Sequence, residues 1–151
     1  MLAVCMRYAV TQEEAEDVMI EGFMKVFTHL NEFKQNSSLE FWIRKIMVYK
    51  AIDNFRSNSK NYYFETIDTD IEIADNVADI ETTLTGREIM EIMREMPELI
   101  KLVFNLRVFE DYSFKEIGKE LEIPESTARV YFKRAKDWIT NKIEKLENHN
   151  I

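Results

Sequence analysis

The sequence has few of the residues that interrupt helices or form covalent cross-links. Among 151 residues there are three glycines, two prolines and one cysteine, Cys5. So few breakers, together with 46% hydrophobic and 12% aromatic residues, predict a globular chain that is almost wholly helical. A lone cysteine excludes an intrachain disulfide, and we expect Cys5 to be a buried thiol.

Signals for membrane insertion, secretion and catalysis are also missing. No apolar run approaches the roughly 20 residues that span a bilayer, and no charged and then apolar leader precedes a cleavage site. We therefore expect a cytoplasmic protein with no membrane insertion. His29 and His149 are isolated, no paired-cysteine spacing is present, and the glycines form no phosphate loop. We expect no enzyme activity, no metal and no cofactor.

The charge is acidic overall but unevenly distributed. The net charge is −8, and the excess lies in the middle third, where residues 65–100 carry two basic and 11 acidic side chains. Between Glu65 and Gly86 there are seven acidic residues and no basic one. This composition predicts a solvated, self-repelling linker over residues 61–84. A DNA mimic that shields a basic surface is the alternative.

Residues 113–136, SFKEIGKELEIPESTARVYFKRAK, have the pattern of a helix-turn-helix. Ser113 and Glu116 form a capping box at the start of the first helix. Phe114, Ile117 and Leu121 then recur at spacings of three and four residues, which gives one apolar stripe. The motif predicts two helices that are joined by a short turn and pack on each other.

The turn and the second helix of this motif favour DNA binding. In the turn Glu122-Ile123-Pro124, Ile123 can fill the angle between the helices, and the second helix is expected from about Glu125. From Arg129 to Lys136 there are four basic residues and no acidic one. Such a face suits phosphates and base edges, whereas the ordinary alternative is a solvated amphipathic helix.

Two further helices are predicted in the first third. Thr11 with Glu14 and Ser37 with Glu40 are spaced as capping boxes. The helix from Gln12 to about Leu30 has a wide apolar band with acidic residues beside it, which suits docking to a protein.

The helix from Ser38 to about Arg56 interleaves aromatic and basic side chains. Such a pattern suits stacking on exposed bases, since every base has a π-face. Trp42, Ile46 and Tyr49 also recur at helical spacing, which is typical of a core stripe, and the sequence leaves both alternatives open.

These segments together resemble an extracytoplasmic-function (ECF) sigma factor, a two-domain subunit that directs bacterial RNA polymerase to promoters. The resemblance is strongest over residues 15–27, 38–56 and 96–136. It implies an all-α fold with a region 2-like domain at 1–60, the linker at 61–84 and a region 4-like domain at 85–151. Met1 falls within the family's first long helix, so we expect that helix to be truncated. A helix-turn-helix regulator of another family and a polymerase-sequestering interaction protein are the alternatives.

The resemblance also implies partners and site residues. The partners are core RNA polymerase and promoter DNA, with an anti-sigma factor as a further candidate. Arg129, Val130 and Lys133 stand at the family's groove-facing positions, and Val130 suits a thymine methyl. The set expected to bind the upstream duplex element is Ser126, Thr127, Arg129, Val130, Lys133, Arg134 and Lys136. The set expected to bind polymerase is Asp17, Glu21, Phe23 and Lys25.

The loop from Phe33 to Ser38 and the helix that follows resemble the family's melting element, which holds a base flipped out of the downstream duplex. Extrusion of a base costs a few kcal/mol that a stacking pocket must offset. The set expected to contact this element is Asn36, Ser37, Ser38, Trp42, Arg44, Lys45, Lys50 and Arg56. Phe41, Tyr49 and Glu122 depart from the family's usual Gly, Asn and Gly, and a positive φ at Glu122 would cost of order 1 kcal/mol.

Overall fold

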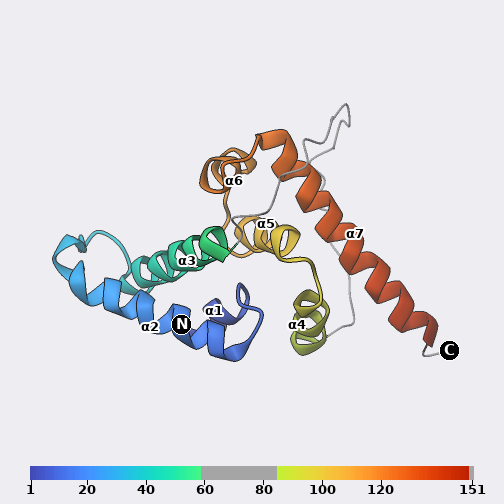
Figure 1. The fold of residues 1–151 in the computed structure, drawn as a ribbon, viewed down its shortest axis with the longest axis horizontal. Coiled ribbons are helices and arrows are strands. Elements are labelled where there is room, and N and C mark those ends of the chain that lie inside the picture. The colour runs from blue at the N-terminus through green and yellow to red at the C-terminus, as the bar shows by residue number, and fades with distance from the viewer. Residues whose placement is uncertain (59–84, 150–151) are drawn as a thin grey trace. The chain divides into compact units, whose positions relative to one another are not determined.

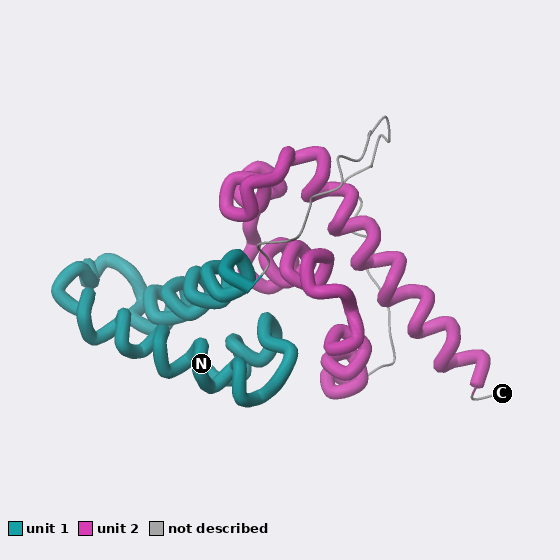
Figure 2. Tube along the Cα trace, in the orientation of Figure 1, with its two compact units in different colours: residues 1–63 teal, residues 64–151 magenta. Residues whose placement is uncertain are grey.

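The described part of the chain, residues 1–58 and 85–149 of a computed structural model, is helical throughout and contains no strand. Figure 1 shows these helices, and Figure 2 shows that the chain divides into two compact units, residues 1–63 and 64–151. The predicted all-α fold is confirmed. The predicted linker at 61–84 lies outside the described residues. None of the described helices is both long and apolar enough to cross a membrane.

The first unit is built on two long helices. Its elements are α1 (Leu2–Met6), α2 (Gln12–Thr28), the 3-10 turn η1 (Leu30–Glu32) and α3 (Leu39–Asn58). Helices α2 and α3 lie side by side, and α1 packs against both (Figure 1). Gly22 permits the close approach, because a Cβ there would lie 2.3 Å from Met47 Sδ. Cys5 is buried in this core as predicted, and burial raises the pKa of its thiol. The buried core residues include Cys5, Ala9, Ala15, Val18, Met47 and Ala51.

The starts of α2 and α3 differ in how well the sequence predicts them. Thr11 Oγ1 accepts a hydrogen bond from the Glu14 N–H at 3.1 Å, and the Glu14 carboxylate accepts one from the Val10 N–H at 2.8 Å. The sequence predicted a capping box at Ser37, and this position is wrong by one residue. The helix begins at Leu39, and the Phe41 N–H donates to Ser38 Oγ at 3.4 Å.

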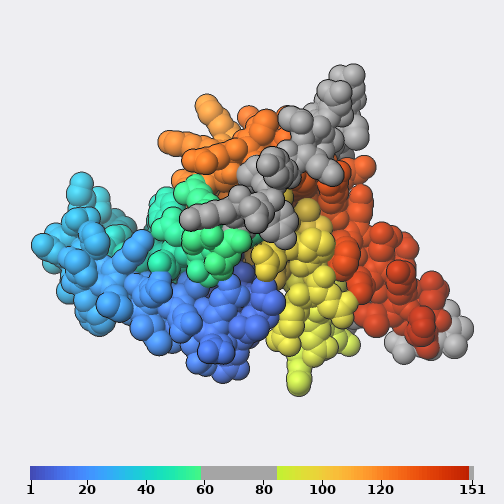
Figure 3. Space-filling view, in the orientation of Figure 1, coloured from blue at the N-terminus to red at the C-terminus, as the bar shows by residue number. Residues whose placement is uncertain are grey.

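The second unit contains α4 (Gly86–Arg94), α5 (Glu98–Val108), α6 (Phe114–Leu121) and α7 (Glu125–His149). Helices α5 and α6 pack on the first half of α7, and α4 lies against its second half (Figure 3). Phe132 of α7 contacts both α5 and α6. Its ring stacks on that of Phe104, with ring centres 5.9 Å apart, and packs edge-on to that of Phe114, with ring centres 5.5 Å apart. The buried apolar residues here include Leu102, Val103, Leu106, Ile117, Leu121, Ala128, Tyr131 and Ala135.

The predicted helix-turn-helix is formed by α6 and α7. The capping box is present, with the Glu116 N–H donating to Ser113 Oγ at 3.1 Å and the Ser113 N–H donating to Glu116 Oε2 at 2.7 Å. Ile123 is buried as predicted. Glu122 is left-handed, with φ 55° and ψ 42°, and its turn brings Ile123 back to donate its N–H to the Gly118 carbonyl at 2.9 Å.

Candidate nucleic-acid and polymerase interfaces

A row of basic side chains follows one face of α7. Arg129, Lys133 and Lys136 recur at spacings of four and three residues, so they lie on one side of the helix. Lys133 is exposed, whereas Arg129 and Lys136 are half-buried. Ser126 and Arg134 are exposed as well. The structure therefore brings five of the seven predicted duplex contacts to solvent.

The aromatic core of the helix-turn-helix supports these basic groups. The Arg129 guanidinium lies 4.7 Å from the centre of the Phe114 ring, and one of its nitrogens is 3.1 Å from Glu125 Oε1. Arg107 approaches the same ring at 4.8 Å. Lys136 lies 5.3 Å from the centre of Phe132. Cation–π contacts of this kind hold flexible side chains in defined positions.

Two predicted duplex contacts do not reach the surface. Thr127 is 5% exposed and Val130 is 7% exposed. Neither side chain lies on the exposed face of α7, so the expected contact of Val130 with a thymine methyl has no exposed group to make it. Helical spacing alone did not reveal this, because burial depends on what packs over the helix.

The loop before α3 brings its polar residues next to an aromatic pair. Asn36, Ser37 and Ser38 are exposed. Phe33 and Trp42, which flank this loop in sequence, have ring centres 5.4 Å apart with a tilt of 51°. Trp42 is half-buried, so part of its surface remains accessible. The two rings that flank the loop are therefore in contact, and the predicted role of the loop in holding a base stays a prediction.

The basic residues of α3 are less uniform. Lys45 is exposed, with its ammonium 5.2 Å from the centre of the Phe41 ring, and Arg44 is half-buried. Lys50 forms an ion pair with Glu21 of α2, and Arg56 lies 3.9 Å from Asp53. Lys50 thus belongs to the contact between α2 and α3, although the sequence had assigned it and Glu21 to different partners.

The predicted polymerase-binding residues of α2 also differ in their surroundings: some are exposed, and others contact α3 or the core. Asp17 is exposed. Lys25 lies 3.4 Å from Asp53, so both Lys25 and Glu21 pair with α3. Phe23 is partly buried against the core of the first unit.

The sequence predicted a docking face on α2, but it did not identify the residues of the exposed apolar stripe on this helix. Ile20 is 56% exposed, Met24 65% and Phe27 72%, and they recur at spacings of four and three residues. The signal was the width of the apolar band, since more of α2 is apolar than one neighbouring helix can cover. An exposed stripe of large apolar side chains marks an interaction surface.

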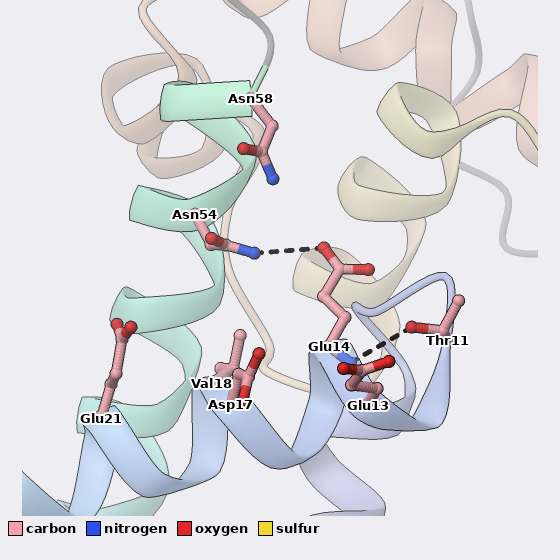
Figure 4. Close-up of a pocket in the computed structure, with 8 residues that line it drawn as sticks. All are labelled: Thr11, Glu13, Glu14, Asp17, Val18, Glu21, Asn54 and Asn58. Carbon is pink, nitrogen blue, oxygen red and sulfur yellow. Dashed lines mark hydrogen bonds between the residues drawn. The ribbon is translucent and has the colours of Figure 1, made fainter.

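An acidic hollow of about 360 Å³ lies between α2 and α3 (Figure 4). Its walls come from the first half of α2 and the end of α3. Asn54 Nδ2 donates to Glu14 Oε1 at 3.1 Å across it. Asp17 and Glu21 both line the hollow, so the structure places these two predicted residues together. The lining residues are Thr11, Glu13, Glu14, Asp17, Val18, Glu21, Asn54 and Asn58. In residues 1–58 and 85–149, no group of three or more His, Cys, Asp or Glu side chains could hold a metal ion.

Comparisons with known proteins agree with this arrangement. The family model for Sigma-70 region 2 matches residues 1–61, and the model for Sigma-70, region 4 matches residues 86–139. An ECF RNA polymerase sigma factor of Bacillus subtilis, SigW, is 23% identical over 95% of this chain and 82% of its own length. The ECF RNA polymerase sigma-E factor of Haemophilus influenzae is 25% identical over 91% of this chain and 78% of its own.

A solved structure has the same fold. It is the sigma factor RpoE of Bartonella quintana in complex with the anti-sigma factor NepR, and it aligns with a TM-score of 0.58 over 95% of this chain and 89% of that one, at 15% identity. In this chain the region 2 match precedes the region 4 match, and each lies in one of the two compact units. The chain belongs to the sigma-70 family and is of the ECF type.

Proposed function

We propose that this chain binds core RNA polymerase through its first unit, contacts promoter DNA with both units, and assists strand opening with the loop before α3. As an ECF sigma factor it serves promoter recognition in transcription initiation. The observation that carries the finer assignment is that an exposed apolar and acidic face on α2 and an exposed basic face on α7 occur in one chain, each within its matched region. The polymerase supplies the catalysis, and the chain works where polymerase and DNA are, in the cytoplasm.

The polymerase contact is assigned to the α2 stripe and its acidic border. Ile20, Met24 and Phe27 supply apolar area, and Asp17 supplies charge at the edge. Interfaces of this composition have an apolar centre and a polar rim. Glu21 and Lys25 remain exposed and pair with α3, so they join the docking face to its neighbouring helix.

The duplex contact is assigned to α7, and the single-strand contact to the loop before α3. Arg129, Lys133 and Lys136 present positive charge on one face, which suits the phosphates and the guanine edge of a groove. Asn36 and Ser37 offer hydrogen bonds to a base edge, next to the Phe33–Trp42 pair. An anti-sigma factor is a candidate regulator, because the solved relative carries one.

The test is run-off transcription with purified core polymerase and the full chain. Promoter-dependent transcripts support a sigma factor, DNA binding without polymerase supports another kind of helix-turn-helix regulator, and polymerase binding with inhibition supports a sequestering protein. Met24→Glu should reduce polymerase binding at least tenfold, because it introduces a charge into an apolar interface. The control Met90→Glu changes a half-buried methionine of the other unit, and equal losses from both variants contradict the α2 assignment.

The two DNA contacts are separated by the step that they affect. Arg129→Ala and Lys133→Ala should weaken closed-complex formation, with a loss of about 1–3 kcal/mol for a base contact. Asn36→Ala should leave duplex binding nearly intact, slow opening, and be rescued on a template that is already melted downstream. If Asn36→Ala opens promoters at the normal rate with unchanged base preference, the loop is not the base pocket.

A further inference from the structure

The first turn of α7 holds a carboxylate where duplex DNA would meet the recognition helix. Glu125 is the first residue of α7, and its side chain is 48% exposed. In helix-turn-helix proteins the N-terminal residues of the second helix contact base edges. A negative group at this place repels phosphates, so a role as a backbone contact does not account for it.

Glu125 is also joined to a basic residue that faces the groove. Its Oε1 atom accepts a hydrogen bond from a guanidinium nitrogen of Arg129 at 3.1 Å. The guanidinium in turn lies 4.7 Å from the centre of the buried Phe114 ring. The carboxylate and the guanidinium are therefore held next to each other on the rigid part of the motif. The backbone positions of Glu125 and Arg129 are about 6 Å apart along the helix axis, which is less than two base-pair steps of about 3.4 Å.

We infer that Glu125 is a specificity-determining residue that selects a cytosine in the upstream element while it holds Arg129 in place. This inference rests on the proposed contact of α7 with duplex DNA. In the major groove, guanine presents only acceptors at N7 and O6, and thymine presents the O4 acceptor and a methyl group. A carboxylate gains nothing from either. Adenine offers the N6 donor beside the N7 acceptor, whereas cytosine offers the N4 donor alone.

The consequence is a paired recognition. Glu125 accepts from cytosine N4, and Arg129 donates to O6 and N7 of a guanine on the same or the next base pair. A guanine or a thymine at the contacted position leaves the carboxylate desolvated and unpaired, which disfavours the wrong sequence. Glu125 thus lowers affinity for DNA in general and raises discrimination.

The experiment is selection of promoters by core polymerase with the full chain, from a library in which the upstream element is random and the downstream element is fixed. The unchanged protein should enrich cytosine at one position by at least about fivefold. Glu125→Gln should shift that position toward adenine, because a Gln side chain pairs with adenine N6 and N7. Glu125→Ala should lose the preference there and bind non-promoter DNA more tightly.

The control is Asp137→Asn, which removes one negative charge from an exposed position on the same helix about 18 Å further along. It should increase non-promoter binding as Glu125→Ala does, without altering base preference. If the Glu125 variants melt normally and select the same bases as the unchanged chain, the inference is overturned and Glu125 only supports the helix. If the unchanged chain with polymerase selects no upstream sequence at all, the proposed function fails as well.

Discussion

At the residue scale, Glu122 and Gly118 constrain the backbone around the turn between α6 and α7. Glu122 has φ 55°, a left-handed conformation that L-residues with a Cβ adopt at a cost of about 1–2 kcal/mol. Gly118 stands where a Cβ would meet the Ile123 carbonyl oxygen at 2.7 Å. Glycine therefore stands at position 118, where a side chain has no room. At position 122, where φ is positive, the residue is glutamate and not glycine.

Glu122→Gly should stabilise the second unit. Removing the Cβ relieves the left-handed strain, and the greater freedom of glycine in the unfolded chain offsets part of the gain, so we expect about 1 kcal/mol. In a domain of this size that raises the melting temperature by about 4–8 °C. Thermal unfolding followed by circular dichroism measures it. Glu122→Ala keeps the Cβ and serves as control, and equal melting of the Gly and Ala variants contradicts the strain.

Gly118→Ala should do the opposite. The new methyl group meets a backbone oxygen that cannot rotate away, so the turn must open, at a cost of about 1–3 kcal/mol. The same melting experiment should show a lower transition temperature. Gly86→Ala is the matched control, because a Cβ there meets nothing within 4 Å. A Gly118→Ala protein that melts like Gly86→Ala would show that the close approach is not rigid.

Residues whose role is local were predictable from the sequence, and those that depend on packing were not. The Ser113 capping box follows from a three-residue spacing and is present. Val130 lies in an exposed-looking stretch of basic residues and is nevertheless buried. Its environment is set by what covers α7, and spacing along one helix contains no such information.

At the scale of elements, sequence patterns predicted where helices form better than they predicted which side chains pair between helices. Helices α2, α3 and α6 were expected near their observed ranges, and α7 begins at the expected Glu125 but continues to His149, beyond the motif that ended at residue 136. The pairing of Glu21 with Lys50 and of Lys25 with Asp53 joins residues far apart in the sequence. Such pairs follow from how two helices lie against each other, so sequence patterns alone assigned Glu21, Lys25 and Lys50 to external partners instead.

Helix α4 should dock less firmly on α7 at acidic pH. The Lys142 ammonium, 2.5 Å from Glu95 Oε2, lowers the pKa of Glu95 below its ordinary value of 4.5. A lowered pKa stabilises the fold above the ordinary value, and this contribution is lost as the pH falls through the lowered one. As the pH falls below about 4.5, the protection of the α4 amide protons, taken relative to the intrinsic exchange rate at each pH, should therefore decrease progressively.

Two variants test this assignment by hydrogen exchange. Glu95→Gln should remove much of the pH dependence, and Lys142→Met should reduce it by removing its cause. The remainder is expected from Glu88, whose pKa is lowered by hydrogen bonds from Thr85 at the start of α4. Unchanged pH dependence in both variants would show that the ion pair does not hold α4.

At the scale of the whole molecule, the acidic charge is concentrated in one stretch of the sequence. Residues 61–84 carry most of the acidic excess, and the sequence leaves open whether this segment only connects the units or also shields the basic face of α7. Replacing its acidic residues by Asn and Gln in the full chain distinguishes the two. Shielding predicts several-fold tighter binding of the free protein to duplex DNA at low salt, whereas a spacer predicts only the small effect of net charge.

The length of the segment should matter more than its composition, because two promoter elements must be reached at once. Fully extended, 24 residues span about 80 Å, which exceeds two turns of B-DNA at about 34 Å each. Deleting half of residues 61–84 should therefore abolish initiation in run-off transcription, while binding to core polymerase through α2 persists. A scrambled segment of the original length is the control and should remain active. If the half-length chain initiates as well as the scrambled one, the two units do not bridge separate elements, and the promoter contacts assigned to α7 and to the loop before α3 are not made together.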